Sequence, residues 1–209
     1  VTGKLACSSN FYILKNNKHI TNKHSRSVSH LLRYKNQGLL TSYKTINSDN
    51  PQLNCRLSGL KQYSPIILIL DKDLNINTTS FIIHNSKNIK TFIFHNSKNY
   101  KRLTKLKKSG IKLIYLEADT DGYINLRKLF KKIYNLGIHD LLVECGKNLT
   151  QRILSEKLFN EFYFFKSNKS LYNKSKIDVL NISKNLKKKF KKYKNVNTYL
   201  DKDTLIHYY

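Results

Sequence analysis

Short apolar runs alternate with amphipathic stretches along this 209-residue chain. Apolar runs bounded by polar turns predict buried strands, and apolar residues spaced three and four apart predict helices. The predicted strands cover residues 3–8, 38–41, 66–70, 91–95, 112–116, 140–144, 161–165 and 204–208, and the predicted helices cover residues 23–34, 125–136 and 148–157, with a turn at 49–51. This alternation is typical of an α/β fold, and the length suits one domain over residues 1–209.

One octapeptide occurs almost unchanged at two places. FIIHNSKN covers residues 81–88, and FIFHNSKN follows eleven residues later at 92–99. Two copies are too few for a solenoid, so we interpret them as two strand and turn units. On this interpretation His84 and His95 are surface residues at strand ends and not metal ligands.

The chain is strongly basic, with 39 lysines and arginines against 13 acidic residues and a formal net charge of +26. Such a balance favours nucleic acid or an anionic surface as a partner. However, 33 of the cations are lysines spread over the whole length, and Lys, Asn and Ile share A/T-rich codons. Genome composition therefore accounts for the bias, and we interpret the dense run Lys184 to Lys194 as a solvated helix face. A nucleic-acid-binding protein without enzymatic activity remains an alternative.

Several classes of protein are excluded by what the sequence lacks. No apolar stretch approaches the roughly 18–20 residues of a membrane span, and the first residues have no signal-peptide pattern. Cys7, Cys55 and Cys145 are an odd number without a C-x-x-C pair, which argues against a disulfide framework or a zinc site and favours the reducing cytoplasm. The chain contains no Met, so we expect that it was cut from a longer polypeptide. Neither a G-x-G-x-x-G fingerprint nor a Walker loop is present.

Two clusters point to chemistry with anions. Three of the six arginines, Arg26, Arg33 and Arg56, lie in the first 56 positions, and the first two share one face of a predicted helix. Guanidinium groups bind phosphate or carboxylate oxygens in a fork that lysine does not reproduce. The second cluster is the strand, turn and helix around Glu144 and Gly146, where Asn148 is predicted to cap the helix with Gln151 as its capping-box partner, and Lys147 adds charge.

A family resemblance connects these clusters. Lys4-Leu-Ala-Cys-Ser8, His19-Ile-Thr21, Ser25-Arg26 and Leu31-Leu-Arg33 resemble the opening motifs of the reductase domain of the riboflavin-pathway deaminase–reductase, K-x-A-x-S, W-I-T, S-R and L-R. Residues 40–56, with Thr45, Asp49-Asn-Pro51 and Arg56, resemble its G-x-x-T-v-x-x-D-[DN]-P-x-L-x-x-R at the same spacing. Residues 65–71 are similar to one of its strands, and Val143-Glu-Cys-Gly146 is similar to its V-E-G-G turn.

The resemblance implies a dihydrofolate-reductase-like three-layer fold, with a mixed, mostly parallel sheet flanked by helices, and a cytoplasmic enzyme. It also implies NADPH-dependent reduction of the ribosyl group of 5-amino-6-(5-phosphoribosylamino)uracil to a ribityl chain. The implied substrate contacts are Asn17, Arg33, Leu53, Arg56 and Glu144. The implied cofactor contacts are Ala6, His19, Thr45, Asp49 and the turn up to Arg152, in particular Gly146, Lys147, Asn148, Leu149 and Thr150. Asp49 and Glu144 are the candidate catalytic residues, and no metal site is implied.

The family also commonly forms homodimers and carries a zinc deaminase domain upstream, whose H-x-E and P-C-x-x-C motifs this chain lacks. The chain departs from the family pattern at four places. The family's S-L-D-G is Ser8-Ser-Asn-Phe11, its W-I-T begins with His19, Cys145 replaces the second glycine of E-G-G, and the later P-x-l-l-G is not recognisable around residues 166–171. A related dihydrofolate-reductase-like oxidoreductase with another substrate, or a reductase that has lost activity, are the alternatives that these departures leave open.

Overall fold

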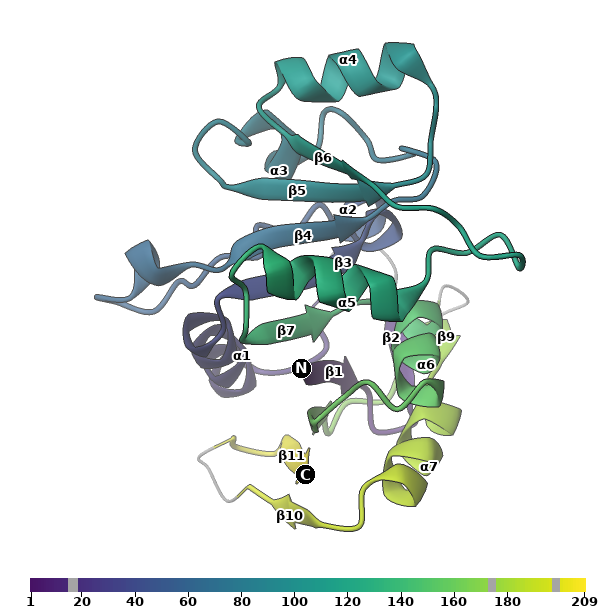
Figure 1. Cartoon of the computed structure of the whole chain (residues 1–209). Coiled ribbons are helices and arrows are strands. Elements are labelled where there is room, and N and C mark those ends of the chain that lie inside the picture. Colours follow the sequence, from purple (N-terminus) through teal and green to yellow (C-terminus); the bar gives the residue numbers. More distant parts are fainter. Residues whose placement is uncertain (15–18, 173–175, 197–199) are drawn as a thin grey trace.

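A nine-stranded sheet forms the centre of the molecule. The computed structural model describes residues 1–14, 19–172, 176–196 and 200–209. The strand order is β10-β11-β8-β1-β7-β3-β4-β5-β6, in which the strands from β8 to β6 are mutually parallel and β11 is antiparallel to both β8 and β10 (Figure 1). The strands are β1 (Thr2–Cys7), β3 (Gly38–Ser42), β4 (Ile66–Leu70), β5 (Thr91–His95), β6 (Lys112–Tyr115), β7 (Leu141–Glu144), β8 (Glu161–Lys166), β10 (Tyr193–Asn195) and β11 (Thr204–Tyr208). A small antiparallel sheet joins β2 (Tyr12–Leu14) to β9 (Lys176–Asp178).

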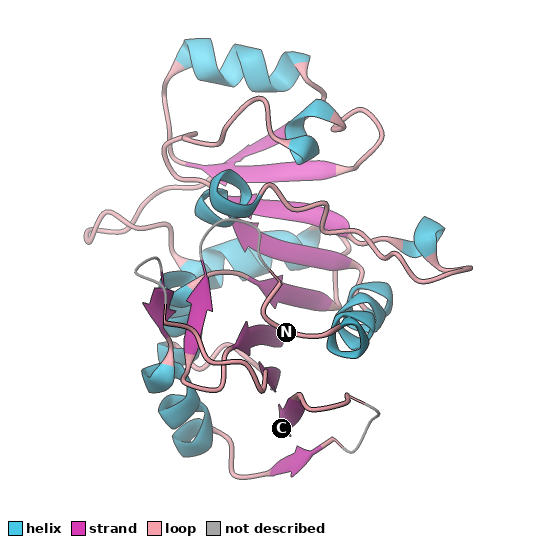
Figure 2. Cartoon of the chain, turned by 180° about the vertical axis from the view of Figure 1, so that it is seen from behind, coloured by secondary structure: helices cyan, strands magenta, loops and turns pink. Residues whose placement is uncertain are grey.

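Helices cover both faces of the large sheet and make three layers. They are α1 (Lys23–Lys35), α2 (Tyr43–Asp49), α3 (Phe81–His84), α4 (Tyr100–Lys108), α5 (Leu126–Asn135), α6 (Lys147–Ser155) and α7 (Leu180–Lys189), with a 3-10 turn at Lys61–Tyr63. One core cluster joins the sheet to α5, α6 and α7, and a second joins it to α1, α2, α3 and α4. Figures 1 and 2 view these two sides, and α5 lies in front of the sheet in Figure 1.

Alternating side chains along the central strands supply both cores. Leu40 and Leu68 belong to the cluster under α5, α6 and α7, whereas their neighbours Leu39 and Ile67 belong to the opposite cluster. All four are buried, as expected of parallel strands with helices on both faces. The α/β fold class with a mostly parallel sheet is therefore confirmed.

Gly3 permits the closest packing around β1. A Cβ atom at this position would lie 2.2 Å from Cδ2 of Phe162 on β8 and 2.8 Å from Cε1 of Phe159. These distances are too short for any side chain, so the glycine lets two aromatic rings pack against the strand. The rings themselves meet edge to face, with centroids 5.1 Å apart.

The near-repeat does not form two equivalent units, and that prediction was wrong. Its first copy forms the short helix α3, where Ile82 and Ile83 are buried and His84 is exposed. Its second copy forms β5, a central strand between β4 and β6, and His95 is buried there at 4% exposure with its ring against Tyr115. Strand pairing on both sides, which only the second copy has, decides the conformation.

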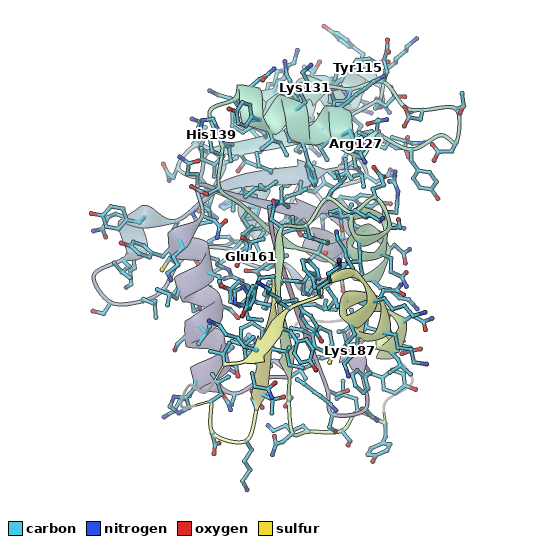
Figure 3. All side chains as sticks on the ribbon, turned by 60° about the horizontal axis from the view of Figure 1, so that its bottom comes forward. Tyr115, Arg127, Lys131, His139, Glu161 and Lys187 are labelled. Atoms are coloured by element: carbon cyan, nitrogen blue, oxygen red, sulfur yellow. The ribbon has the colours of Figure 1, made fainter. Side chains whose placement is uncertain are left out.

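The cysteines are free and buried, and the excess charge lies on the helices. Burial raises the pKa of the Cys7 and Cys145 thiols to about 12, and the Cys55 side chain has no exposed surface. Exposed cations line the outer helices, including Arg127 and Lys131 on α5 and Lys187 on α7 (Figure 3). The run that ends at Lys194 is only partly helical, because α7 stops at Lys189 and β10 follows. Among the described residues, no helix combines the length and apolarity needed to cross a membrane.

Candidate active site

A cleft opens at the carboxyl ends of β1 and β7, beside α1 and α2. Its volume is about 280 Å³. Ligands of open α/β sheets bind at this edge, because the strand ends and helix starts leave a crevice there. Ten residues predicted from the sequence line it: Ala6, His19, Arg26, Arg33, Thr45, Asp49, Leu53, Arg56, Glu144 and Gly146.

A forked ion pair lies at the floor of this cleft. Arg33 on α1 donates from Nε to Oε1 of Glu144 at 2.8 Å and from Nη2 to Oε2 at 2.9 Å. Lys4 is opposite Glu144 in the register of β1 and β7, and its Nζ lies 3.8 Å from Oε2. The three side chains are only 11–16% exposed, so this is a largely buried pair of cations around one carboxylate.

The two cations keep Glu144 ionised. Burial acts to raise the pKa of this carboxyl, but Arg33 and Lys4 outweigh burial and lower the pKa to about 2. Burial lowers the pKa of the Lys4 ammonium, with Glu144 acting in the opposite direction and Arg33 adding to the decrease. The Lys4 ammonium therefore releases its proton more readily than the ammonium of a lysine in water.

The stability of the fold should depend on the ionisation of Glu144. Its folded-state pKa of about 2 is below the ordinary value of 4.5, so its contribution is complete above pH 4.5 and is lost as the pH falls toward 2. The difference corresponds to about 3 kcal/mol at most. Urea unfolding measures this dependence. The free energy of unfolding of the wild-type protein should exceed that of Glu144→Gln at about pH 6, and this difference should shrink as the pH falls to about 3. Glu117→Gln, which changes an exposed carboxylate, should leave the pH dependence as in the wild type.

The loop after α2 presents a backbone carbonyl to α1, beside the cleft. Asn50 and Leu53 both adopt left-handed backbone angles, with φ of 42° and 54°. Such angles are unfavourable for leucine, and they persist where the surrounding structure fixes them. The carbonyl of Asn54 accepts from Nη1 of Arg33 at 3.1 Å and lies 3.1 Å from Nδ1 of His30. The loop is thus tied to α1 beside the ion pair.

Two more arginines, Arg56 and Arg26, line the cleft, and their guanidinium groups donate to different partners. Arg56 is exposed, and its Nη1 donates to Oδ1 of Asn54 at 2.9 Å and to Oε1 of Gln52 at 3.2 Å. Arg26 donates from Nη1 to the carbonyl of Thr21 at 2.7 Å and so fixes the segment that contains His19. Arg56 keeps several donors for an anion, whereas three of the five N–H groups of Arg33 are already engaged.

The turn into α6 differs from the predicted cap. The helix starts at Lys147 with Gly146 as its N-cap residue, so the prediction of Asn148 as the cap with Gln151 as its partner was wrong. Leu149 and Thr150 are buried, and the Thr150 hydroxyl lies 3.3 Å from Sγ of Cys145. The first backbone N–H groups of α6 have no side-chain cap and point out of the helix end.

Comparisons with known proteins identify the family of the chain. A family model described as "RibD C-terminal domain" matches residues 14–196. The chain belongs to the RibD C-terminal domain family. The Riboflavin biosynthesis protein RibD of Aquifex aeolicus is 28% identical over 197 residues, which cover 93% of this chain and 52% of that protein. The 5-amino-6-(5-phosphoribosylamino)uracil reductase of Buchnera aphidicola is 27% identical over 190 residues, covering 83% and 88%.

Solved structures show the same fold. Acinetobacter baumannii RibD, form 1, superposes with a TM-score of 0.76 at 20% identity, over 99% of this chain and 56% of that one. This RibD C-terminal domain thus spans about half the length of the RibD relatives named above.

The structure shows how this RibD C-terminal domain accommodates its departures from the family pattern. Phe11 stands where the family has a turn glycine, and it adopts φ of 62°. Its ring packs against Phe164 at 6.5 Å and beneath the Lys166 ammonium at 4.4 Å, contacts that a glycine lacks. Asn10, in place of the family aspartate, accepts from the Ser8 hydroxyl at 2.7 Å and from the Leu171 backbone N–H at 3.0 Å.

Sequence reasoning missed Lys4 and His30 as cleft residues of this RibD C-terminal domain. Lys4 had a visible signal, because it is the charged residue within the otherwise uncharged strand β1. His30 had none, since only the position of the Asn54 carbonyl gives it a role. Asn17 lies outside the described residues. Lys147 and Asn148 are in the first turn of α6 beyond the lining of the cleft, while Thr45 and Asp49 enter it from α2.

Proposed function

We propose that this chain is an NADPH-dependent reductase that converts the ribosyl group of 5-amino-6-(5-phosphoribosylamino)uracil to the ribityl chain. The observation that carries the proposal is the cleft in which Lys4, Arg33 and Glu144 form a buried cluster beside the exposed guanidinium of Arg56. Four cations and two carboxylates line this cleft, a balance that suits a phosphorylated ligand. The relative from Buchnera aphidicola is named for this reaction.

The turn at Gly146 fits a dinucleotide cofactor. A Cβ atom at Gly146 would meet nothing within 4 Å, and its φ of −72° is one that any residue adopts. Neither the backbone nor the packing of the free protein therefore requires a glycine, but the missing side chain leaves room for a pyrophosphate to approach the uncapped N–H groups of α6. Bound NADPH would supply a hydride to C1′ of the sugar.

The residues of the chain position the substrate and move one proton. Arg56 holds the phosphate with its unengaged donors, and Glu144 stays ionised at neutral pH and fixes the ammonium of Lys4 nearby. As the sugar ring opens, the C1′–O4′ bond breaks and O4′ takes a proton from Lys4, while the exocyclic nitrogen forms a double bond to C1′. A hydride accepted at C1′ would return that electron pair to the nitrogen.

Gly146→Val tests the cofactor contact. Valine should lower the free energy of unfolding by only about 1 kcal/mol, because its Cβ meets no atom within 4 Å and the remaining cost is that of a poorer N-cap residue. We expect KM for NADPH to rise by about 10–100-fold, since the side chain occupies the approach to the helix end. Steady-state kinetics and urea unfolding measure the two quantities. Gly59→Val is the matched control for a glycine with open space elsewhere, although its φ of 75° makes some loss of stability expected there.

The proposed activity is tested by NADPH oxidation, followed by absorbance. The deaminated and the non-deaminated phosphoribosylaminopyrimidines are supplied in parallel, with a control that lacks substrate. Turnover with the deaminated compound is the expected result. Absence of turnover with either compound, in a preparation that still binds NADPH by fluorescence, contradicts the proposed substrate.

A further inference from the structure

His30 occupies a part of the cleft that the proposed chemistry does not use. It lies on α1, three residues before Arg33, and lines the cleft together with Arg33 and Arg56. Its Nδ1 is 3.1 Å from the Asn54 carbonyl oxygen, the same oxygen to which Arg33 donates. Leu53, the residue before Asn54, has a left-handed backbone φ of 54°.

This contact fixes the tautomer of the imidazole. A carbonyl oxygen only accepts hydrogen bonds, so Nδ1 of His30 carries the proton. Burial, with the neighbouring charges of Arg33 and Arg56, lowers the pKa of His30 to about 4, against smaller opposing effects of the Asn54 carbonyl and Glu144. The ring is therefore neutral at pH 7, and Nε2 is a hydrogen-bond acceptor.

Few groups beside Arg33 in this cleft accept a hydrogen bond without carrying charge. Lys4, Arg26, Arg33 and Arg56 only donate, and both oxygens of Glu144 already accept from Arg33. The second carboxylate of the lining, Asp49, enters from α2, whereas His30 lies on α1 with Arg33. A phosphate held by Arg56 satisfies donors, but a sugar hydroxyl beside that phosphate also needs an acceptor for its own proton. His30 and Arg56 both line the cleft, and the charge of Arg56 contributes to the lowered pKa of His30.

We propose that His30 selects the substrate by accepting, at Nε2, a hydrogen bond from a sugar hydroxyl of the phosphoribosyl group. This role rests on the proposed function, because it assigns one further contact to the same substrate. It makes the cleft specific for a hydroxylated sugar phosphate and not for phosphate alone, since a ligand without the hydroxyl leaves the acceptor unpaired.

Kinetics of three variants test the contact. His30→Leu removes the acceptor, and we expect KM for the phosphoribosyl substrate to rise about five- to tenfold while KM for NADPH changes by less than about twofold. His30→Gln, which offers an amide oxygen, should recover part of this loss. His24→Leu changes an exposed histidine on the same helix and should match the wild type. Equal KM values for His30→Leu and the wild type, or equal losses in the leucine and glutamine variants, overturn the proposal.

Nitrogen NMR of ¹⁵N-histidine-labelled protein separates this proposal from the proposed function. The resonances of His30, assigned by their loss in His30→Gln, should report a neutral ring protonated at Nδ1. Ribose 5-phosphate should shift the Nε2 resonance, whereas inorganic phosphate should leave it in place. Protonation at Nε2, or no shift with ribose 5-phosphate at saturation, contradicts the role of His30 even if the enzyme turns over. Absence of turnover with an intact shift contradicts the proposed reaction alone.

Discussion

Replacing Arg33 with leucine is expected to lower the free energy of unfolding by about 3–5 kcal/mol and to remove measurable reductase activity. Removing one partner of a buried ion pair leaves an uncompensated charge, which costs far more than the pair contributes. Glu144 is only 11% exposed and would keep just Lys4, at 3.8 Å, in place of the two short bonds from Arg33. Urea unfolding and NADPH oxidation measure the two effects.

The triple variant Lys4→Met/Arg33→Leu/Glu144→Leu separates the cost of an unbalanced buried charge from the loss of packing. Because none of the three buried charges remains in it, its stability should exceed that of Arg33→Leu, although its activity stays absent. Arg33→Lys should recover only part of the stability, since an ammonium does not form the two parallel bonds. Arg127→Leu, on the exposed surface of α5, is the control. A triple variant less stable than Arg33→Leu would show that the cluster stabilises the fold through packing instead.

Lys4→Met should reduce kcat by about 10²–10³-fold with little change in KM for NADPH. Methionine preserves most of the aliphatic stem but removes the proton that we assign to O4′, and general acids contribute on this scale. Arg33 still neutralises Glu144, so the variant should fold. The wild-type rate should fall as the pH rises through the lowered pKa of Lys4, and this limb should be absent from the variant.

The matched control is Lys35→Met, at the exposed C-terminal end of α1. It should retain both the wild-type rate and the wild-type pH profile. If Lys4→Met instead raises KM for the substrate at unchanged kcat, Lys4 binds the ground state and donates no proton in the rate-limiting step.

The site was more predictable from the sequence than some of the elements around it. The spacing of Thr45, Asp49 and Arg56 identified α2 and the loop after it, which line the cleft, because motif spacing reflects fixed geometry at a ligand. The sequence did not predict a role for Asn54, since its contribution is a backbone carbonyl that any residue supplies. The pairing of Lys4 with Glu144 follows from the register of β1 and β7, which only the folded sheet shows.

Local sequence failed where neighbouring elements decide the structure. Residues 81–88 and 92–99 are nearly identical, yet only the second copy lies between two strands. Helix α4 was missed because its few apolar positions, of which Leu106 is buried, are separated by lysines that obscure the helical period. Asn148 is of a residue type that commonly caps helices. However, α6 already begins at Lys147, and Gly146 is its N-cap residue.

The reactivity of the three free cysteines reports local opening of the folded protein. Cys7 in β1, Cys55 beside the strained loop and Cys145 at the floor of the cleft are each 0–8% exposed. A thiol-alkylating reagent therefore reaches each one only when the backbone around it opens. The labelling rate of Cys55 would report how often the loop opens. The labelling rate of Cys7 would report how often the central sheet opens. Comparing the two rates with and without ligand would reveal which part of the molecule becomes rigid on binding.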